Sequence, residues 1–341
     1  MAIEIRQASI EDRSRILVFL KEHWNSEHIF VRNPQLFDYY HLKENKITFV
    51  IAEENETRKI LGIQGYILAN NNENPDVWGV IWKVIPNSVP MLGVLIMKYI
   101  RKTTNCRIFA GVGANPNTTL KIIKGMREFT GKLDHYYRLA DLERYSIAKV
   151  EAKIIPPINI CNQRDLLPIK NEKELLLNFN MDFSYKKPFK SMEYIIDRYF
   201  NHPIHKYKVY AIIQKDQEKY ISIIVCRIQE YKESKVLRII DFIGNVQELK
   251  YVGIALQKML DSKEYEYIDF YCKGIEPKIL QDMGFILRDE NDKNIIPNYF
   301  EPFIAENIEI YYNTSDDVDF YVFKGDGDQD RPNTIHKEQE E

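Results

Sequence analysis

Two histidines, an aspartate and a tyrosine are the residues whose types best suit proton transfer. His28 lies in WNSEHIF and His202 in NHP, and an imidazole titrates near neutral pH. Asp241 follows the apolar run RII, where a buried carboxylate needs either a partner or a function. Tyr271 follows IDF at the end of another apolar run. Structural roles stay open for all four: a surface or N-cap-region histidine, a helix-end histidine, an ion-paired aspartate and a packed ring.

Hydrophobic periodicity predicts an α/β protein in which one order of elements occurs twice. Each pass has a helix, a hairpin, a strand, a helix, a strand, a helix and a strand. The first pass begins with an extra strand at residues 3–9 and continues through segments 9–24, 47–69, 76–85, 90–102, 106–114, 117–129 and 131–140. The second pass comprises segments 189–203, 207–229, 234–244, 248–260, 265–274 and 276–287, the last a helix running into a strand.

The chain length of 341 residues predicts two domains. We expect a first domain at 1–150, a linker and the start of the second half at 151–190, a second domain at 191–333 and a disordered tail at 334–341. The 47 basic and 50 acidic side chains leave a net charge of −3, which argues against nucleic-acid and membrane partners. A charged N-terminus and the lack of an apolar run of about 18 residues predict a cytoplasmic protein.

The cysteines and the acidic tail do not predict a metal site. The four cysteines are widely spaced and without a C-x-x-C pair, which favours a structural role for Cys106, Cys161, Cys226 and Cys272. Asp326, Asp328 and Asp330 alternate, but a calcium-binding loop that began at Asp326 would need glycine and glutamate where Arg331 and Lys337 stand. We therefore expect no metal.

The repeated layout resembles the acyl-CoA-dependent N-acetyltransferase (GNAT) fold over nearly the whole chain. The motifs that carry this resemblance are IQGY in the first hairpin, WKVIPNSVPMLGV and the helix-to-strand ending ILQDMGF. The resemblance implies two tandem GNAT-like domains, each a mixed, mostly antiparallel sheet flanked by helices. It also implies acyl-CoA as a co-substrate and no metal.

In GNAT proteins two neighbouring strands part, the thioester arm enters between them, and the pyrophosphate lies at a helix N-terminus. The first half resembles this arrangement better, because in the second half the loop GNVQELKYV before the helix-opening Gly253 has lost the phosphate-binding pattern. Pro90 counts against tight pyrophosphate binding because it removes one donor, and Asn115 has an equally good role as a helix cap. The resemblance implies an oxyanion donor at Val84 or a neighbour, and coenzyme A contacts from Trp82, Lys83, Val84, Gly93, Val94, Gly113 and Asn115.

A narrower resemblance is carried by the strings IWKV, GKLDHYY, IDFIG, PNYFEPF and KGDGDQDRPN. They are similar to tandem GNAT-like sugar N-acyltransferases of bacterial surface-polysaccharide clusters. The implied acceptor is the amine of a nucleotide-linked amino-deoxy sugar, such as a dTDP-3-amino-3,6-dideoxyhexose. From their residue types and their positions in such a fold, the candidate catalytic residues are His28, Asp241, Tyr271 (as an acid) and His202. Recognition of a nucleotide sugar needs aromatic rings and cations, so the candidate acceptor contacts are Tyr299, Phe300, Glu301 and Arg331.

Two other functions remain open. An aminoacyl-tRNA-dependent transferase also uses tandem GNAT-like halves, although the near-neutral charge argues against a tRNA surface. A non-catalytic nucleotide-sugar-binding protein with a decayed GNAT site would account for the missing glycines.

Overall fold

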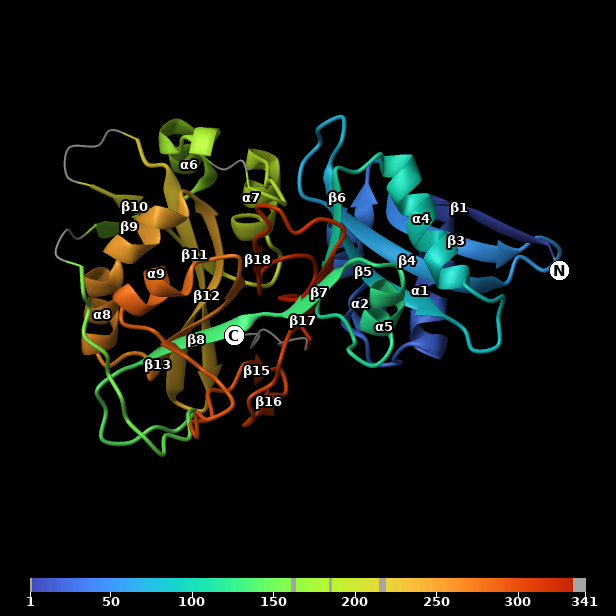
Figure 1. The fold of residues 1–341 in the computed structure, drawn as a ribbon. Helices are drawn as coiled ribbons and strands as arrows, with labels where there is room; N and C mark the ends of the chain where they lie inside the picture. Colours follow the sequence, from blue (N-terminus) through green and yellow to red (C-terminus); the bar gives the residue numbers. More distant parts are fainter. Residues whose placement is uncertain (1, 161–163, 184–185, 215–218, 334–341) are drawn as a thin grey trace, which may run out of the picture.

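The computed structural model describes residues 2–160, 164–183, 186–214 and 219–333. Within them the chain forms two eight-stranded sheets flanked by helices (Figure 1). Each sheet joins antiparallel pairs with one parallel pair. The predicted α/β class with mixed, mostly antiparallel sheets is confirmed. Cys161 and the segment 334–341 lie outside the described residues.

The first part of the chain follows the predicted order. Its elements are β1 (Ile3–Ser9), α1 (Arg13–His23), α2 (Ile29–Arg32), α3 (Pro34–His41), β2 (Leu42–Lys43), β3 (Lys46–Glu54), β4 (Ile60–Leu68), β5 (Asp76–Val84), α4 (Leu92–Thr104), β6 (Ile108–Val112), α5 (Thr119–Gly125) and β7 (Phe129–Lys132).

The second part begins with β8, which directly follows the first part, and repeats that order after a linking region. Its elements are β8 (Asp134–Leu139), β9 (Asp165–Ile169), α6 (Glu172–Asn178), α7 (Met192–Tyr199), β10 (Tyr207–Ile213), β11 (Ser222–Tyr231), β12 (Ser234–Gly244), α8 (Gly253–Asp261), β13 (Tyr267–Lys273), α9 (Pro277–Asp282), β14 (Ile286–Leu287), β15 (Tyr299–Phe300), β16 (Phe303–Ile304), β17 (Tyr311–Thr314) and β18 (Val322–Phe323).

Successive side chains of a strand point to opposite faces of the sheet, and both faces of each sheet carry apolar residues. In β3, Phe49 and Ile51 pack with the helices α1 to α3. Their neighbours Val50 and Ala52 pack on the other face, against α4. Helix α4 buries Ile96 there, on the face that its apolar spacing predicts.

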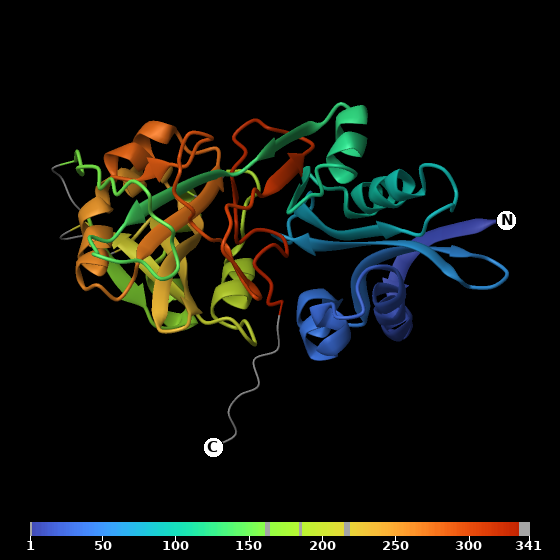
Figure 2. The ribbon, with the colours of Figure 1, turned by 90° about the horizontal axis from the view of Figure 1, so that it is seen from below.

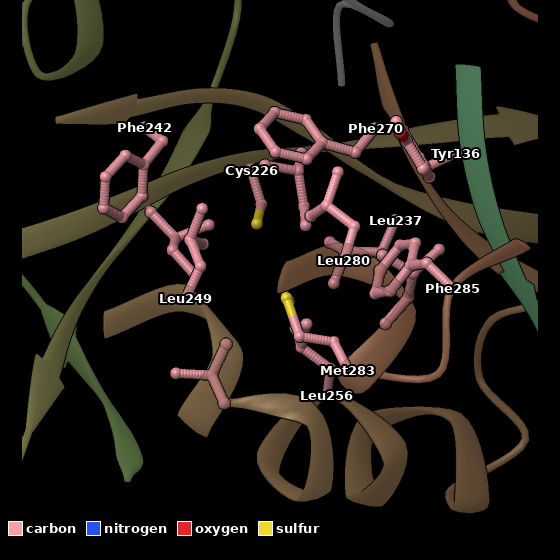
Figure 3. Close-up of a cluster of buried hydrophobic side chains, with 14 of the residues drawn as sticks. Tyr136, Cys226, Leu237, Phe242, Leu249, Leu256, Phe270, Leu280, Met283 and Phe285 are labelled. Atoms are coloured by element: carbon pink, nitrogen blue, oxygen red, sulfur yellow. The ribbon is translucent and has the colours of Figure 1, made fainter. Parts of the chain in front are cut away.

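The second sheet is covered on one face by α8 and α9. Leu256 of α8 and Leu280 of α9 are fully buried against Leu237 and Phe270 of the strands (Figure 3). Cys226 and Cys272 belong to the same apolar cluster, and burial raises the pKa of both thiols. Both therefore act as small apolar side chains.

One strand does not lie where the sequence predicts. The segment 131–140 was expected to close the first half, but only β7 belongs to the first sheet, in the order β1-β3-β4-β5-β6-β17-β7. Its continuation β8 pairs with β13 and β14 in the second sheet, and Figure 1 shows it crossing between the halves. In return β17, from near the C-terminus, lies between β6 and β7. The expectation was wrong because strand partners are set by non-local packing, which periodicity does not report.

The two halves therefore exchange one strand each. The segment that follows β17 runs between the halves (Figure 2). The domain boundaries at residues 150 and 190 stay predictions, although strand pairing divides the first pass at residue 133.

Candidate functional site

The strands predicted to part do so in the first half. The parallel ladder between β5 and β6 runs from Asp76 opposite Ile108 to Trp78 opposite Ala110 and ends there. Beyond it β5 stays paired to β4 as far as Val84. The register between β4 and β5 shifts at Ile81, which has a φ of 41°. A bulge of this kind turns a strand away from its neighbour, so it accounts for the divergence.

The second half parts at the corresponding place. Its parallel ladder joins β12 to β13 from Leu237 to Ile239, and the register of β12 against β11 then shifts at Ile240. Here the opening is filled, because β18 pairs with Cys272 and Lys273 on the edge of β13. The ring of Phe323 joins the apolar core. A cavity of about 30 Å³ remains.

The opening in the first half continues into a cleft of about 990 Å³. One end of the cleft lies between α4 and α5, where Met97, Thr118 and Ile123 line it. The other end lies against the C-terminal segment, where Asp328 and Gln329 line it. The predicted residues that line this cleft are Trp82, Lys83, Gly113, Asn115, Tyr299 and Arg331.

The N-terminus of α4 packs against the cleft-lining Trp82 and has no side-chain cap. Met91 occupies the N-cap position at a φ of 61°, and such an end leaves backbone N–H groups free for an anion. A Cβ on Gly93 would lie 2.9 Å from Trp82 Nε1, so glycine allows the indole to lie directly against the helix. Trp82 Nε1 is buried and has no hydrogen-bond partner among the described residues.

Two other residues predicted for coenzyme A lie beside the cleft and do not line it. Val94 is a buried residue in the first turn of α4. The side chain of Val84 packs against Gly62. The oxyanion donor at Val84 or a neighbour stays a prediction.

Gln64 and Asn313 line the cleft and were not predicted. Gln64 lies on β4 beside the bulge, is 3% exposed, and its Oε1 has no partner in the described part of the chain. Asn313 lies on β17, with Oδ1 facing Gly111. The polar Gln64 within the apolar run ILGIQGYIL was the available signal, whereas Asn313 had none, because β17 joins this sheet only in the fold.

The C-terminal segment that lines the cleft is held by one ion pair within itself and one to β11 of the second half. Asp328 Oδ2 accepts a hydrogen bond from Arg331 Nη1 at 2.5 Å. Asp330 accepts from Arg227 of β11 at 2.6 Å, and burial opposed by Arg227 leaves the pKa of Asp330 well below its usual range. Gln329 donates to the hydroxyl of Tyr299 at 3.2 Å.

Gly327 brings this segment to the parted strands. It has a φ of 57°, and a Cβ there would lie 3.4 Å from Val112 and 3.6 Å from Val80. Asp328, the next residue in the sequence, therefore lies close to the point where β5 and β6 diverge.

The two predicted histidines are buried at helix ends. His28 caps α2, where Nδ1 accepts from the backbone N–H of Phe30 at 3.2 Å. His202 Nε2 lies 3.0 Å from the hydroxyl of Tyr40 and so joins the two halves. Burial, aided by the charge of Arg331, lowers the pKa of His28 to about 3. Burial, aided by His205, lowers that of His202 to about 2. Neither value favours a general base near neutral pH.

Asp241 and Tyr271 lie in other buried networks. Asp241 lies 2.5 Å from Lys190 Nζ and accepts from the hydroxyl of Tyr199. Burial lowers the pKa of Lys190, but Asp241 and Asp326 outweigh that effect and raise it. Tyr271 stacks on His135 at 3.9 Å and lines a separate cavity. None of the four predicted catalytic residues lines the cleft, and their catalytic roles stay predictions.

Phe300 and Glu301 belong to the small β15–β16 hairpin region, beside the cleft-lining Tyr299. The guanidinium carbon of Arg238 lies 5.5 Å from the ring centroid of Phe300. Glu301 accepts from the backbone N–H of Asn333 at 3.1 Å.

Among the described residues, no group of three or more His, Cys, Asp or Glu side chains is arranged to hold a metal ion. In the same part of the chain, no helix is long and apolar enough to cross a membrane.

The sequence matches no protein-family model, and the search among curated proteins finds no match. The structure is similar to a probable N-acyltransferase of unknown function from Enterococcus faecalis V583, with a TM-score of 0.53 and 8% identity over 92% of this chain and 72% of that one. It is also similar to a GCN5-related N-acetyltransferase from Anabaena variabilis, with a TM-score of 0.50 and 11% identity over 92% and 72% of the two chains. With the two parted sheets, these similarities show that this chain has a tandem GNAT-like fold.

Proposed function

We propose that the chain is an acyl-CoA-dependent N-acyltransferase whose first half holds the coenzyme A. One asymmetry carries the proposal. Both halves part between two parallel strands, but the second opening is filled by β18 and Phe323 and keeps about 30 Å³. The first opens into a cleft of about 990 Å³, at the large end of the range for ligand sites.

The coenzyme A end of this proposal is the groove between α4 and α5. The uncapped N-terminus of α4 offers backbone N–H groups and the positive end of its dipole to a pyrophosphate. Trp82 Nε1 adds an unused donor beside it, and Lys83 adds a cation at the cleft wall. Met97 and Ile123 supply apolar surface for the pantetheine arm.

The thioester belongs where β5 and β6 diverge. The backbone at the Ile81 bulge has left its register with β4 and has no partner on β6. An N–H group oriented there would stabilise the oxyanion that develops during acyl transfer. Gln64 lies across the register from the bulge and offers a second, unused polar group.

The acceptor end is the part of the cleft lined by the C-terminal segment. The amine of a nucleotide-linked amino-deoxy sugar, of the dTDP-3-amino-3,6-dideoxyhexose type, is the acceptor we propose. Tyr299 offers an aromatic ring for the base and Arg331 a cation for a phosphate. Asp328 is placed to accept a hydrogen bond from the amine, which needs only modest help to lose its proton.

Coenzyme A binding tests the first part of the proposal. Isothermal titration with coenzyme A should give saturable binding, weakened at least about tenfold by Gly93→Ala, because the new methyl would displace Trp82 from the helix. Gly125→Ala is the matched control, since a Cβ there meets nothing within 4 Å. Failure of the wild-type protein to bind coenzyme A would favour a non-catalytic protein.

Thiol release tests the acceptor separately. An acyl-CoA with a panel of dTDP- and UDP-linked amino sugars should release free thiol in a thiol-detection assay. Coenzyme A binding without turnover on any amino sugar would contradict the acceptor class and leave the coenzyme A site standing.

A further inference from the structure

A second cavity, of about 350 Å³, lies where the two sheets meet. It is lined by residues of β8 and β13 and of the turn after β14, among them His135, Tyr271 and Arg288. Its volume lies within the range for small-molecule sites. The acyl-transfer proposal does not use it.

A chain of buried polar contacts ends at this cavity. Arg238 holds Asp269 with two nitrogens, Nε at 2.9 Å from Oδ1 and Nη2 at 2.8 Å from Oδ2. Asp269 Oδ2 lies 3.2 Å from His135 Nε2. His135 Nδ1 lies 3.3 Å from Arg288 Nε. Arg238, Asp269 and His135 are all at most 2% exposed.

Only one protonation state of His135 satisfies both its contact to Asp269 and its contact to Arg288. An arginine Nε–H only donates, so Nδ1 must accept from Arg288 and Nε2 must carry the proton donated to Asp269. Burial, opposed by Asp269, lowers the pKa of His135 to about 4, so the ring is neutral near pH 7. His135 therefore orients the guanidinium of Arg288 without repelling it.

The rest of that guanidinium is unused. Among the described residues, Nη1 and Nη2 of Arg288 have neither a hydrogen bond nor an ion pair. The nearby acids are engaged elsewhere: Asp134 with Lys273 at 3.1 Å, and Glu309 with Lys132 at 2.6 Å. Asp289 accepts from the backbone N–H of Asn291 at 2.8 Å.

We propose that Arg288 binds an oxyanion in this cavity, a phosphate or a carboxylate group of a small ligand. A guanidinium presents two parallel N–H donors that match either group, and fixing its Nε in advance reduces the entropy lost on binding. His135 is a positioning residue in this site. The site stands independently of acyl transfer.

Isothermal titration of the full chain with inorganic phosphate and, separately, with malonate tests the site. At least one probe should bind, and the one that binds more tightly identifies the class. Arg288→Met should weaken that binding at least about tenfold, as expected for losing a charge-assisted bidentate contact. Arg144→Met, which removes an exposed arginine outside this cavity, is the control and should bind as the wild type does.

Two variants of His135 separate positioning from folding, and one of Glu290 tests the charge at the rim. His135→Gln keeps an acceptor and a donor and should retain most of the affinity, whereas His135→Leu should lose as much as Arg288→Met. Glu290→Gln removes an exposed acid from the rim and should strengthen binding about twofold or more. No binding of either probe to the wild type, or equal binding to Arg288→Met, would overturn the proposal.

Discussion

Lys324 is a buried lysine without a carboxylate at salt-bridge distance among the described residues, and its charge should destabilise the fold. It is 3% exposed, and its Nζ lies 5.8 Å from the ring centroid of Tyr271 and 5.1 Å from that of Tyr299. Burial, aided by Arg238 and opposed by Asp330, lowers its pKa from 10.5 to about 7. We predict that Lys324→Met stabilises the protein at neutral pH, because methionine fills a similar volume and packs well on aromatic rings.

The size of this stabilisation follows from the linkage between protonation of Lys324 and folding. The difference between 10.5 and 7 is 3.5 pK units, so carrying the proton into the fold costs about 5 kcal/mol below pH 7. Between pH 7 and 10.5 the unfolded lysine holds a proton that the native one has lost, so stability rises with pH. The penalty that methionine removes is therefore about 4 kcal/mol at pH 7 and about 1 kcal/mol at pH 9.5.

Urea unfolding at a series of pH values measures this. The free energy of unfolding of Lys324→Met minus that of the wild type should fall by about 3 kcal/mol between pH 7 and pH 9.5. Lys173→Met, which changes an exposed lysine on α6, should give a difference that does not depend on pH. A Lys324→Met difference that stays level over this range would refute the reasoning.

Two other outcomes are expected. Asp328→Asn should lower kcat at least about tenfold with little change in coenzyme A affinity, because it weakens the contact to the acceptor amine and leaves the α4 groove intact; unchanged turnover would remove Asp328 from the site. A fragment of residues 1–133 should not unfold cooperatively by circular dichroism, since β17 is missing between β6 and β7. A sharp melting transition in that fragment would contradict the strand exchange.

The cleft lining near α4 and α5 was largely predictable, because it comes from segments close together in the sequence. Trp82, Gly93 and Asn115 surround the strand–loop–helix units that carried the resemblance. At the other end of the cleft, the lining residues Tyr299 and Arg331 were among the predicted residues, but Asp328 was not. It was considered only as a calcium ligand, and its place depends on how the C-terminal segment runs between the halves.

The surroundings of the predicted catalytic residues depend on the fold, and their catalytic roles stay predictions. Asp241 lies on an apolar strand, which demanded a partner or a function, and the fold supplies the partner Lys190 from outside that strand. His28 and His202 were chosen because imidazole titrates near neutral pH, but burial lowers both pKa values far below that range. Burial is a tertiary property that the local sequence does not report.

The amino-acid sequence by itself determined the order of helices and strands, the two passes of one layout and the α/β class. These follow from the spacing of apolar side chains, which acts within a few residues. Only the tertiary structure decided that β8 and β17 are exchanged and that β18 fills the second opening while the first stays open. It also brought Arg288, His135 and Asp269 together. These features depend on pairing and burial between segments far apart in the chain, where many partners have similar local propensity and packing selects one.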